Sequence, residues 1–164
     1  MDSRRNPCAE QYDDVRQTIE RVVQDESDPA RAMDGVVELL AQHLPDYTWV
    51  GIYLLEGQEL VLGPFRGAPS PHTRIPIGSG ICGAAAAQRE TIIVDDVNAD
   101  SRYLACSLET QSEIVVPIMH EGRVLGEIDV DSNRAAAFSP TDRTLLEGVA
   151  AALAPILSGV TRTG

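Results

Sequence analysis

The chain has 164 residues, which is room for one domain of ordinary size and excludes a comfortable pair of domains. Hydrophobic residues make up 43% of it, enough to build a core and too many for a disordered tail. The 25 acidic side chains outnumber the 13 basic ones and give a formal net charge of −12. Because nucleic acid and anionic membrane surfaces attract positive charge, we predict neither as a partner.

Signals for targeting and for cofactors are sparse. No apolar run approaches the roughly 20 residues of a membrane helix, and the first residues lack the apolar stretch of a signal peptide. Three cysteines (Cys8, Cys82 and Cys106) without a secretion signal favour a reducing, cytoplasmic setting. Because neither a Cys-x-x-Cys pair nor a His-Glu-x-x-His helix occurs, we predict no zinc site, and we predict no cofactor.

The chain is expected to begin with two helices. Residues 1–10 are predicted to be a flexible N-terminus and residues 11–160 the domain. Apolar residues at helical spacing predict a first helix over 11–24. Asp28-Pro29 is typical of a cap followed by the first position of a helix, which should then run to about His43.

The rest of the chain alternates strand patterns with loops. The expected elements are strands 47–55 and 59–65 as a hairpin, a loop 66–79, a helix 80–88, a strand 91–94, a long loop 95–111 with a short helix around Cys106, strands 113–120 and 123–131 as a second hairpin, and a final helix after Ser139. Together these elements predict one α+β domain with a mostly antiparallel sheet. A loop as long as 95–111 within a compact domain is commonly functional.

Acidic and aliphatic residues alternate in the second strand of the second hairpin. Since successive side chains of a strand point to opposite faces, Glu127, Asp129 and Asp131 share one face. That face is either a solvated surface or the wall of a pocket roofed by loops. Glu113 in the partner strand could add a carboxyl group, and crowded carboxyl groups raise one another's pKa until one can act as an acid near neutral pH. Such a cluster also suits a ligand's ammonium group.

Two thiols and two aromatic residues are further candidates. Cys106, in the long loop, is either reactive or buried and inert. Cys82 begins a helix of small residues, whose N-terminus would lower the pKa of the thiol, with simple packing as the alternative. Trp49 and Tyr53 share a strand face and form either ordinary sheet packing or an aromatic wall whose N–H and O–H can donate to a small ligand. His72 is expected to be exposed in its proline-rich loop.

Seven motifs, in order, resemble the free methionine-(R)-sulfoxide reductases, which are stand-alone GAF-domain enzymes. The resemblance covers about residues 30–157. The motifs are Trp49-Val-Gly-Ile-Tyr53, Leu62-Gly-Pro-Phe65, Arg74-Ile-Pro-Ile-Gly78, Gly80-Ile-Cys82-Gly83, Ala105-Cys106, Ser112-Glu-Ile-Val-Val-Pro117 and Asp129-Val-Asp131-Ser132. The resemblance implies a GAF domain with the N-terminal and C-terminal helices on one side of the sheet and long loops over a pocket on the other.

The resemblance also implies an activity, the thiol-dependent reduction of free L-methionine-(R)-sulfoxide to L-methionine through a cysteine sulfenic acid. It assigns roles to residues at matching positions: Cys106 as the nucleophile, Cys82 as the family's second cysteine, Glu113, Asp129 and Asp131 as the acidic cluster, and Trp49 and Tyr53 as the aromatic wall. One of the acids would protonate the departing oxygen, and the remaining charge would bind the substrate ammonium.

Two positions depart from the family pattern. His72 stands where the family has a third, resolving cysteine, which resembles a two-cysteine subtype. Glu127 stands where the family tends to be aliphatic. Without the third cysteine, the sulfenic acid would be resolved by Cys82, giving a disulfide for thioredoxin, or by an external thiol; Cys8 is a remote third option.

Two other classes of function stay open. One is a GAF module that binds a small molecule without catalysis, since a fold alone does not decide function. The other is a redox sensor in which Cys82 and Cys106 form a switch. The oligomeric state is also open, with a homodimer as one candidate.

Overall fold

The structure is a computed structural model and describes residues 9–104 and 108–159. Its elements, in chain order, are α1 (Ala9–Asp25), α2 (Pro29–His43), β1 (Trp49–Glu56), β2 (Glu59–Arg66), β3 (Arg74–Pro76), α3 (Gly80–Gln88), β4 (Ile92–Val94), a 3₁₀ turn (Val97–Ala99), β5 (Ser112–His120), β6 (Arg123–Ser132) and α4 (Pro140–Ser158). Within these ranges no helix combines the length and the apolar character needed to span a bilayer.

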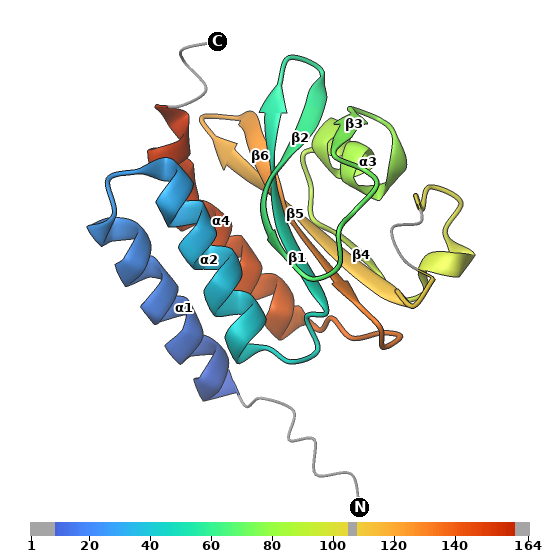
Figure 1. The fold of residues 1–164 in the computed structure, drawn as a ribbon, viewed down its shortest axis with the longest axis horizontal. Helices are drawn as coiled ribbons and strands as arrows, with labels where there is room; N and C mark the ends of the chain where they lie inside the picture. Colours follow the sequence, from blue (N-terminus) through green and yellow to red (C-terminus); the bar gives the residue numbers. More distant parts are fainter. Residues whose placement is uncertain (1–8, 105–107, 160–164) are drawn as a thin grey trace, which may run out of the picture.

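The strands form a single antiparallel sheet in the order β3-β2-β1-β6-β5-β4. Helices α1, α2 and α4 lie together on one side of it, and α3 lies on the other, beside β3 (Figure 1). The buried apolar residues accordingly fall into two clusters, one under the three long helices and one around α3. The α+β class, the antiparallel sheet and the placing of the helices are confirmed.

The helix boundaries follow local signals. Asp28 caps α2 by accepting a hydrogen bond from the Ala30 N–H at 3.0 Å, and α2 ends at His43 as predicted. Helix α1 begins at Ala9, two residues before the predicted start of the first helix. Residues 1–8 lie outside the described residues.

The prediction of an unbroken loop over 66–79 is wrong, because this segment contains β3. Ile75 is buried at 4% exposure and pairs with Leu60 of β2, so an apolar side chain holds the segment on the sheet edge. Pro76 is tolerated there, since an edge strand does not need every N–H for pairing. The long loop 95–111 contains a 3₁₀ turn over Val97–Ala99, and the predicted helix around Cys106 falls on residues outside the described ranges.

A buried carboxylate at the start of α4 ties the helical layer together. One oxygen of Asp142 accepts hydrogen bonds from the hydroxyls of Tyr12, at 3.0 Å, and Tyr47, at 2.7 Å. The other oxygen accepts from the Ser139 N–H at 2.8 Å and from its hydroxyl at 2.9 Å. Asp142 therefore links α1, the segment before β1 and the N-terminus of α4.

We expect Asp142→Ala to lower the free energy of unfolding by about 3 kcal/mol, because it removes a helix cap and leaves two tyrosine hydroxyls without their acceptor. Chemical denaturation measures the change. Thr141→Ala, an exposed position in the same helical turn, is the matched control and should change stability little. Equal effects of the two substitutions would contradict the role given to Asp142.

Candidate functional site

The candidate site lies on the α3 side of the sheet. There the neighbouring strands β1, β6 and β5 place acidic and aromatic side chains in rows across the sheet. The strand register places Trp49 opposite Asp131, which in turn lies opposite Glu113. In the next row, Gly51 of β1 lies opposite Asp129. In the third row, Glu127 lies between Tyr53 of β1 and Pro117 of β5. The alternation of acidic and aliphatic residues along β6, together with the pairing of β6 with β1 and β5, therefore brings four acids and two aromatic residues together.

The acids are buried, so the solvated alternative for this strand face is wrong. Glu113, Asp129 and Asp131 are 2–4% exposed and Glu127 is fully buried. Among the described residues, both oxygens of Glu127 and one oxygen each of Asp129 and Asp131 have no hydrogen-bond partner. Because isolated buried carboxylates are costly, the cluster must hold protons or receive a positively charged ligand.

Burial sets the protonation of the cluster. Burial and the charges of Asp129 and Asp131 raise the pKa of Glu113 well above its usual value. Burial and the charge of Asp129 likewise raise the pKa of Asp131 and of Glu127. The pKa of Asp129 is also raised by burial, against the opposing effect of hydrogen bonding with Glu113 and Cys82. The cluster can therefore retain a proton at a pH where free carboxylic acids are ionised.

Cys82 lies against this cluster from α3. Its thiol is 5% exposed and donates a hydrogen bond to an Asp129 oxygen at 3.3 Å. Burial, followed by the charges of Asp129, Glu127 and Glu113, raises the pKa of the thiol well above its usual value. The expectation that the helix N-terminus makes Cys82 partly thiolate is wrong, because burial and three carboxyl groups outweigh the helix dipole.

A glycine positions Cys82. An added Cβ on Gly83 would lie 2.6 Å from the Pro76 carbonyl oxygen, so only a residue without a side chain lets the first turn of α3 approach β3 this closely. The Gly83 N–H also donates to the Ser79 carbonyl at 2.9 Å. The glycine after Cys82 in the sequence motif thus sets the position of α3 on the sheet.

The two aromatic side chains, Trp49 and Tyr53, hold the loop of residues 67–73 between β2 and β3, which covers the site. The indole N–H of Trp49 donates to the Ala68 carbonyl, and the Tyr53 hydroxyl donates to the His72 carbonyl, both at 2.9 Å. The expectation that these donors are available to a ligand is therefore not met in this conformation. The rings of Trp49 and Tyr53 lie 6.5 Å apart, and Trp49 stacks on Phe65 at 5.8 Å, so the two rings adjoin each other as both alternatives require, and their role toward a ligand stays a prediction.

Gly51 leaves the space that Trp49 occupies. A Cβ at this position would collide with the indole ring. We expect Gly51→Ala to displace the only tryptophan of the chain and to lower the free energy of unfolding by about 1–3 kcal/mol. Fluorescence emission should move to longer wavelength as the ring becomes hydrated. An unchanged spectrum would show that Trp49 does not depend on Gly51 for its position.

The thiol, the acids and the covering loop enclose a small cavity. Its volume is about 20 Å³, and its lining includes Tyr53, His72, Cys82, Glu113 and Asp129. This is room for about one water molecule. His72 is half-buried in the cavity wall, whereas the sequence predicted it to be exposed. Ile75 of β3, Gly80 at the start of α3 and Leu104 also line the cavity, and none of the three was predicted as a site residue because none carries a polar or reactive side chain.

A second cavity, of about 80 Å³, lies beside Trp49. Trp49, Asp131 and Thr110 contribute to its lining, together with the loop at 68–70. Glu113 and Asp129 line the smaller cavity, whereas Asp131 lines the larger one. Among the described residues, then, the covering loops leave little free space over the carboxyl groups.

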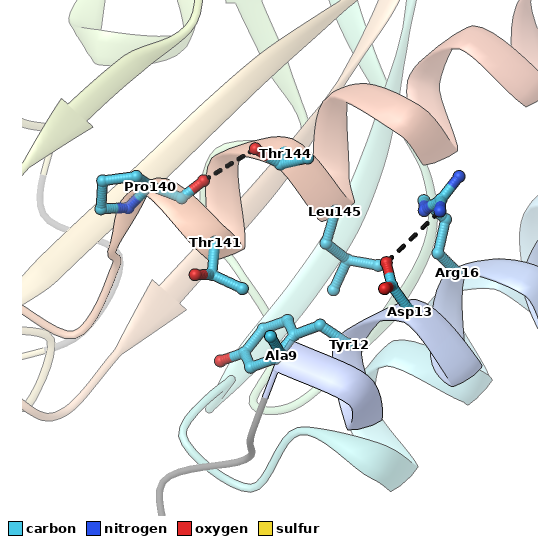
Figure 2. A pocket seen from close by; sticks show the side chains of 8 residues that line it. All are labelled: Ala9, Tyr12, Asp13, Arg16, Pro140, Thr141, Thr144 and Leu145. Atoms are coloured by element: carbon cyan, nitrogen blue, oxygen red, sulfur yellow. Dashed lines mark hydrogen bonds and ion pairs between the residues drawn. The ribbon is translucent and has the colours of Figure 1, made fainter.

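Larger hollows lie elsewhere. A groove of about 300 Å³ runs between α1 and the first turns of α4, lined by Tyr12 and Leu145 among others (Figure 2). Its charged side chains, Asp13 and Arg16, pair with each other at 3.3 Å. The described residues that line it include no cysteine and no histidine. In the part of the chain that the structure describes, this groove therefore lacks the reactive groups that line the small cavity beside Cys82.

Three groups of the cluster are close enough to share a cation. The Cys82 sulfur and one oxygen each of Glu113 and Asp129 lie within 4.8 Å of one another. A metal ion would need all three groups deprotonated, whereas burial favours the protonated form of each. The absence of a metal site stays a prediction from the sequence.

Of the predicted site residues, Cys106 and also Cys8 lie outside the described residues. The described structure brings together all the others: Cys82, Glu113, Asp129, Asp131, Trp49 and Tyr53. Residues flanking Cys106 also reach the site, since Leu104 lines the smaller cavity and Glu109 the larger one.

A buried row of acids, a thiol and two adjoining aromatic side chains lie beneath loops on an antiparallel sheet. Residues 28–157 match the GAF domain family, and the chain belongs to it. The chain is 33% identical to the free methionine-R-sulfoxide reductase of Escherichia coli over 147 residues, which are 90% of this chain and 88% of that protein.

Solved structures point to the same relatives. Free methionine-R-sulfoxide reductase from Neisseria meningitidis, in complex with its substrate, superimposes with a TM-score of 0.88 at 38% identity and covers 95% of this chain and 93% of that one. The type II enzyme from Thermoplasma acidophilum has a TM-score of 0.78 at 38% identity, over 80% of this chain and 93% of that one. Within the GAF family, the chain is a member of the free methionine-R-sulfoxide reductases.

Proposed function

We propose that this protein reduces free L-methionine-(R)-sulfoxide to L-methionine with electrons from thiols. The observation that carries the proposal is the buried row of Glu113, Asp131 and Trp49, with Asp129 and Cys82 beside it, in a chain of this family. Negative charge without a partner suits the substrate ammonium, and the aromatic wall suits the S-methyl group.

The chemistry requires a thiol nucleophile and an acid. Cys106 attacks the sulfoxide sulfur while a carboxyl group with a raised pKa, for which Glu113 is the best candidate, protonates the oxygen. The products are methionine and a sulfenic acid on Cys106, so the sulfoxide is reduced and the cysteine is oxidised by two electrons. The proton that the oxygen gains is replaced by the one that the thiol loses.

Cys82 then resolves the sulfenic acid. An S–S bond forms between Cys82 and Cys106, the S–O bond breaks, and the Cys82 proton leaves with the hydroxyl as water. Thioredoxin or another thiol reductant returns the disulfide to two thiols. This route follows from His72 standing where the family has its third cysteine, since an imidazole cannot form a disulfide.

Substrate entry needs the covering loop to move. The cavity of about 20 Å³ holds about one water and no methionine sulfoxide. Two hydrogen bonds, from Trp49 and Tyr53, fasten the loop at Ala68 and His72. Opening breaks these bonds and frees the two donors, and closure over the substrate restores them.

The test is a thioredoxin-coupled assay on the separated R and S epimers of free methionine sulfoxide. The R epimer should be turned over, and the S epimer and peptide-bound sulfoxide should react poorly. Cys106→Ser should abolish turnover, whereas Cys8→Ser is the matched control and should retain it. Intact activity in Cys106→Ser, or binding of a small molecule with no turnover at all, would contradict the proposal and favour a sensor.

The cytoplasmic location and the homodimer remain predictions from the sequence. Light scattering of the purified protein measures the second of these directly.

A further inference from the structure

Glu127 is the acid of the cluster that the proposed reaction does not use. It is fully buried in the middle of β6, and neither oxygen has a hydrogen-bond partner among the described residues. It does not contribute to the lining of either cavity beside the acid cluster. A buried carboxyl group without partners opposes folding, so its position calls for a reason other than stability.

The neighbours of Glu127 point to Cys82. On the same strand face, Asp129 follows Glu127 and accepts the Cys82 hydrogen bond at 3.3 Å. After burial and the charge of Asp129, the charge of Glu127 also contributes to the raised pKa of the Cys82 thiol, and the thiol in turn lowers the pKa of Glu127 against the effect of burial. Helix α3 packs on β6, so the Cys82 thiol lies against Asp129, and Glu127 is the next acid along the same face of that strand.

Every ionisable group found to act on this thiol is an acid. Asp129 and Glu127 act from β6, and Glu113 acts from β5. On the β1 side of Glu127, Tyr53 directs its hydroxyl to the His72 carbonyl, and His72 lines the cavity. None of the arginines in the described ranges forms an ion pair with these acids.

We propose that Glu127 is a positioning residue that acts through Cys82, keeping its thiol protonated in the resting protein. Only Cys106 is then available to attack the sulfoxide, and Cys82 reacts after the sulfenic acid has formed. This consequence for turnover rests on the proposed function. The proposed effect of Glu127 on the Cys82 thiol is independent of that function, because it is argued from the packing of α3 on β6.

The test titrates Cys82 alone. In a Cys8→Ser/Cys106→Ser background Cys82 is the only thiol, and its thiolate is followed by ultraviolet absorbance, with the same protein carrying Cys82→Ser as the blank. Adding Glu127→Gln should give about tenfold more thiolate at a given pH, which is a shift of about one unit to lower pH. Glu90→Gln removes an exposed carboxylate just beyond α3 and should leave the titration unchanged.

Glu127→Leu removes the carboxyl group without introducing a buried amide, and it should shift the titration in the same direction. A thiol titration that neither Glu127 variant moves would overturn the inference, as would a wild-type thiol that titrates like an ordinary cysteine. Because this background cannot turn over substrate, the result is independent of the reductase assay. An active enzyme with an unmoved titration would refute only the role of Glu127.

Discussion

Glu113→Gln is expected to lower kcat/KM for the R epimer by about 100-fold, because glutamine keeps the shape of the side chain and cannot supply an acidic proton. Glu113 lies opposite Asp131 on the neighbouring strand and lines the cavity beside Cys82. Steady-state kinetics measure the change. Glu56→Gln, an exposed position at the end of β1, is the matched control and should retain wild-type kinetics.

The same substitution should stabilise the protein, and the stabilisation should grow with pH. The pKa of Glu113 is raised by burial and by Asp129 and Asp131, so the folded state holds a proton that the unfolded chain releases. Wild-type stability is therefore full below the unfolded pKa and declines as pH rises toward the folded pKa. Each such group contributes about 1.4 kcal/mol per pH unit within that window.

Glutamine at position 113 resembles the protonated acid at every pH. Its unfolding free energy should match that of the wild type near pH 4, the range of an unfolded glutamic acid, and exceed it by more than about 1 kcal/mol near pH 8. Denaturation at both values measures this difference. Unchanged kcat/KM in Glu113→Gln would exclude Glu113 as the proton donor. A stability difference between variant and wild type that does not depend on pH would contradict the raised pKa of Glu113.

Cys82→Ser is expected to separate the two halves of the reaction. With thioredoxin as reductant, turnover should fall by more than about tenfold, because no disulfide can form for thioredoxin to reduce. With dithiothreitol, turnover should remain within about threefold of the wild type, since a small thiol can reduce a sulfenic acid directly.

The buried position of Cys82 makes a control necessary. Serine at a site that is 5% exposed retains a donor toward Asp129, so folding should be preserved, and circular dichroism checks this. Cys8→Ser should behave as the wild type with both reductants. If Cys82→Ser kept full activity with thioredoxin, the resolving role would belong to another group.

Much of the site was predictable because it follows strand periodicity. Alternation alone places Glu127, Asp129 and Asp131 on one face, and Glu113, predicted to lie near them, is opposite Asp131 in the strand register. Whether that face is dry could not be predicted, because burial depends on loops that converge from distant parts of the chain. The hydrogen bonds from Trp49 to Ala68 and from Tyr53 to His72 show how such a loop is held down.

Which of the two alternatives for Cys82 holds, a partly ionised thiol or simple packing, could not be predicted for a related reason. The helix N-terminus is a local signal, visible in the sequence, and its effect falls off within one turn. The groups that outweigh it lie on β5 and β6, between 31 and 47 residues further along the chain, and only the fold brings them together. The short strand β3 was missed because three residues ending in proline carry too little pattern.

The central claim is that one cysteine takes the oxygen from the substrate and a second cysteine resolves it. A single-turnover reaction tests it most directly: reduced protein is mixed with L-methionine-(R)-sulfoxide without reductant, and its cysteines are mapped by mass spectrometry. We predict one methionine per chain, a Cys82–Cys106 disulfide in the wild type, and a trapped sulfenic acid on Cys106 in Cys82→Ser. Methionine formed while Cys106 stays a free thiol would contradict the account.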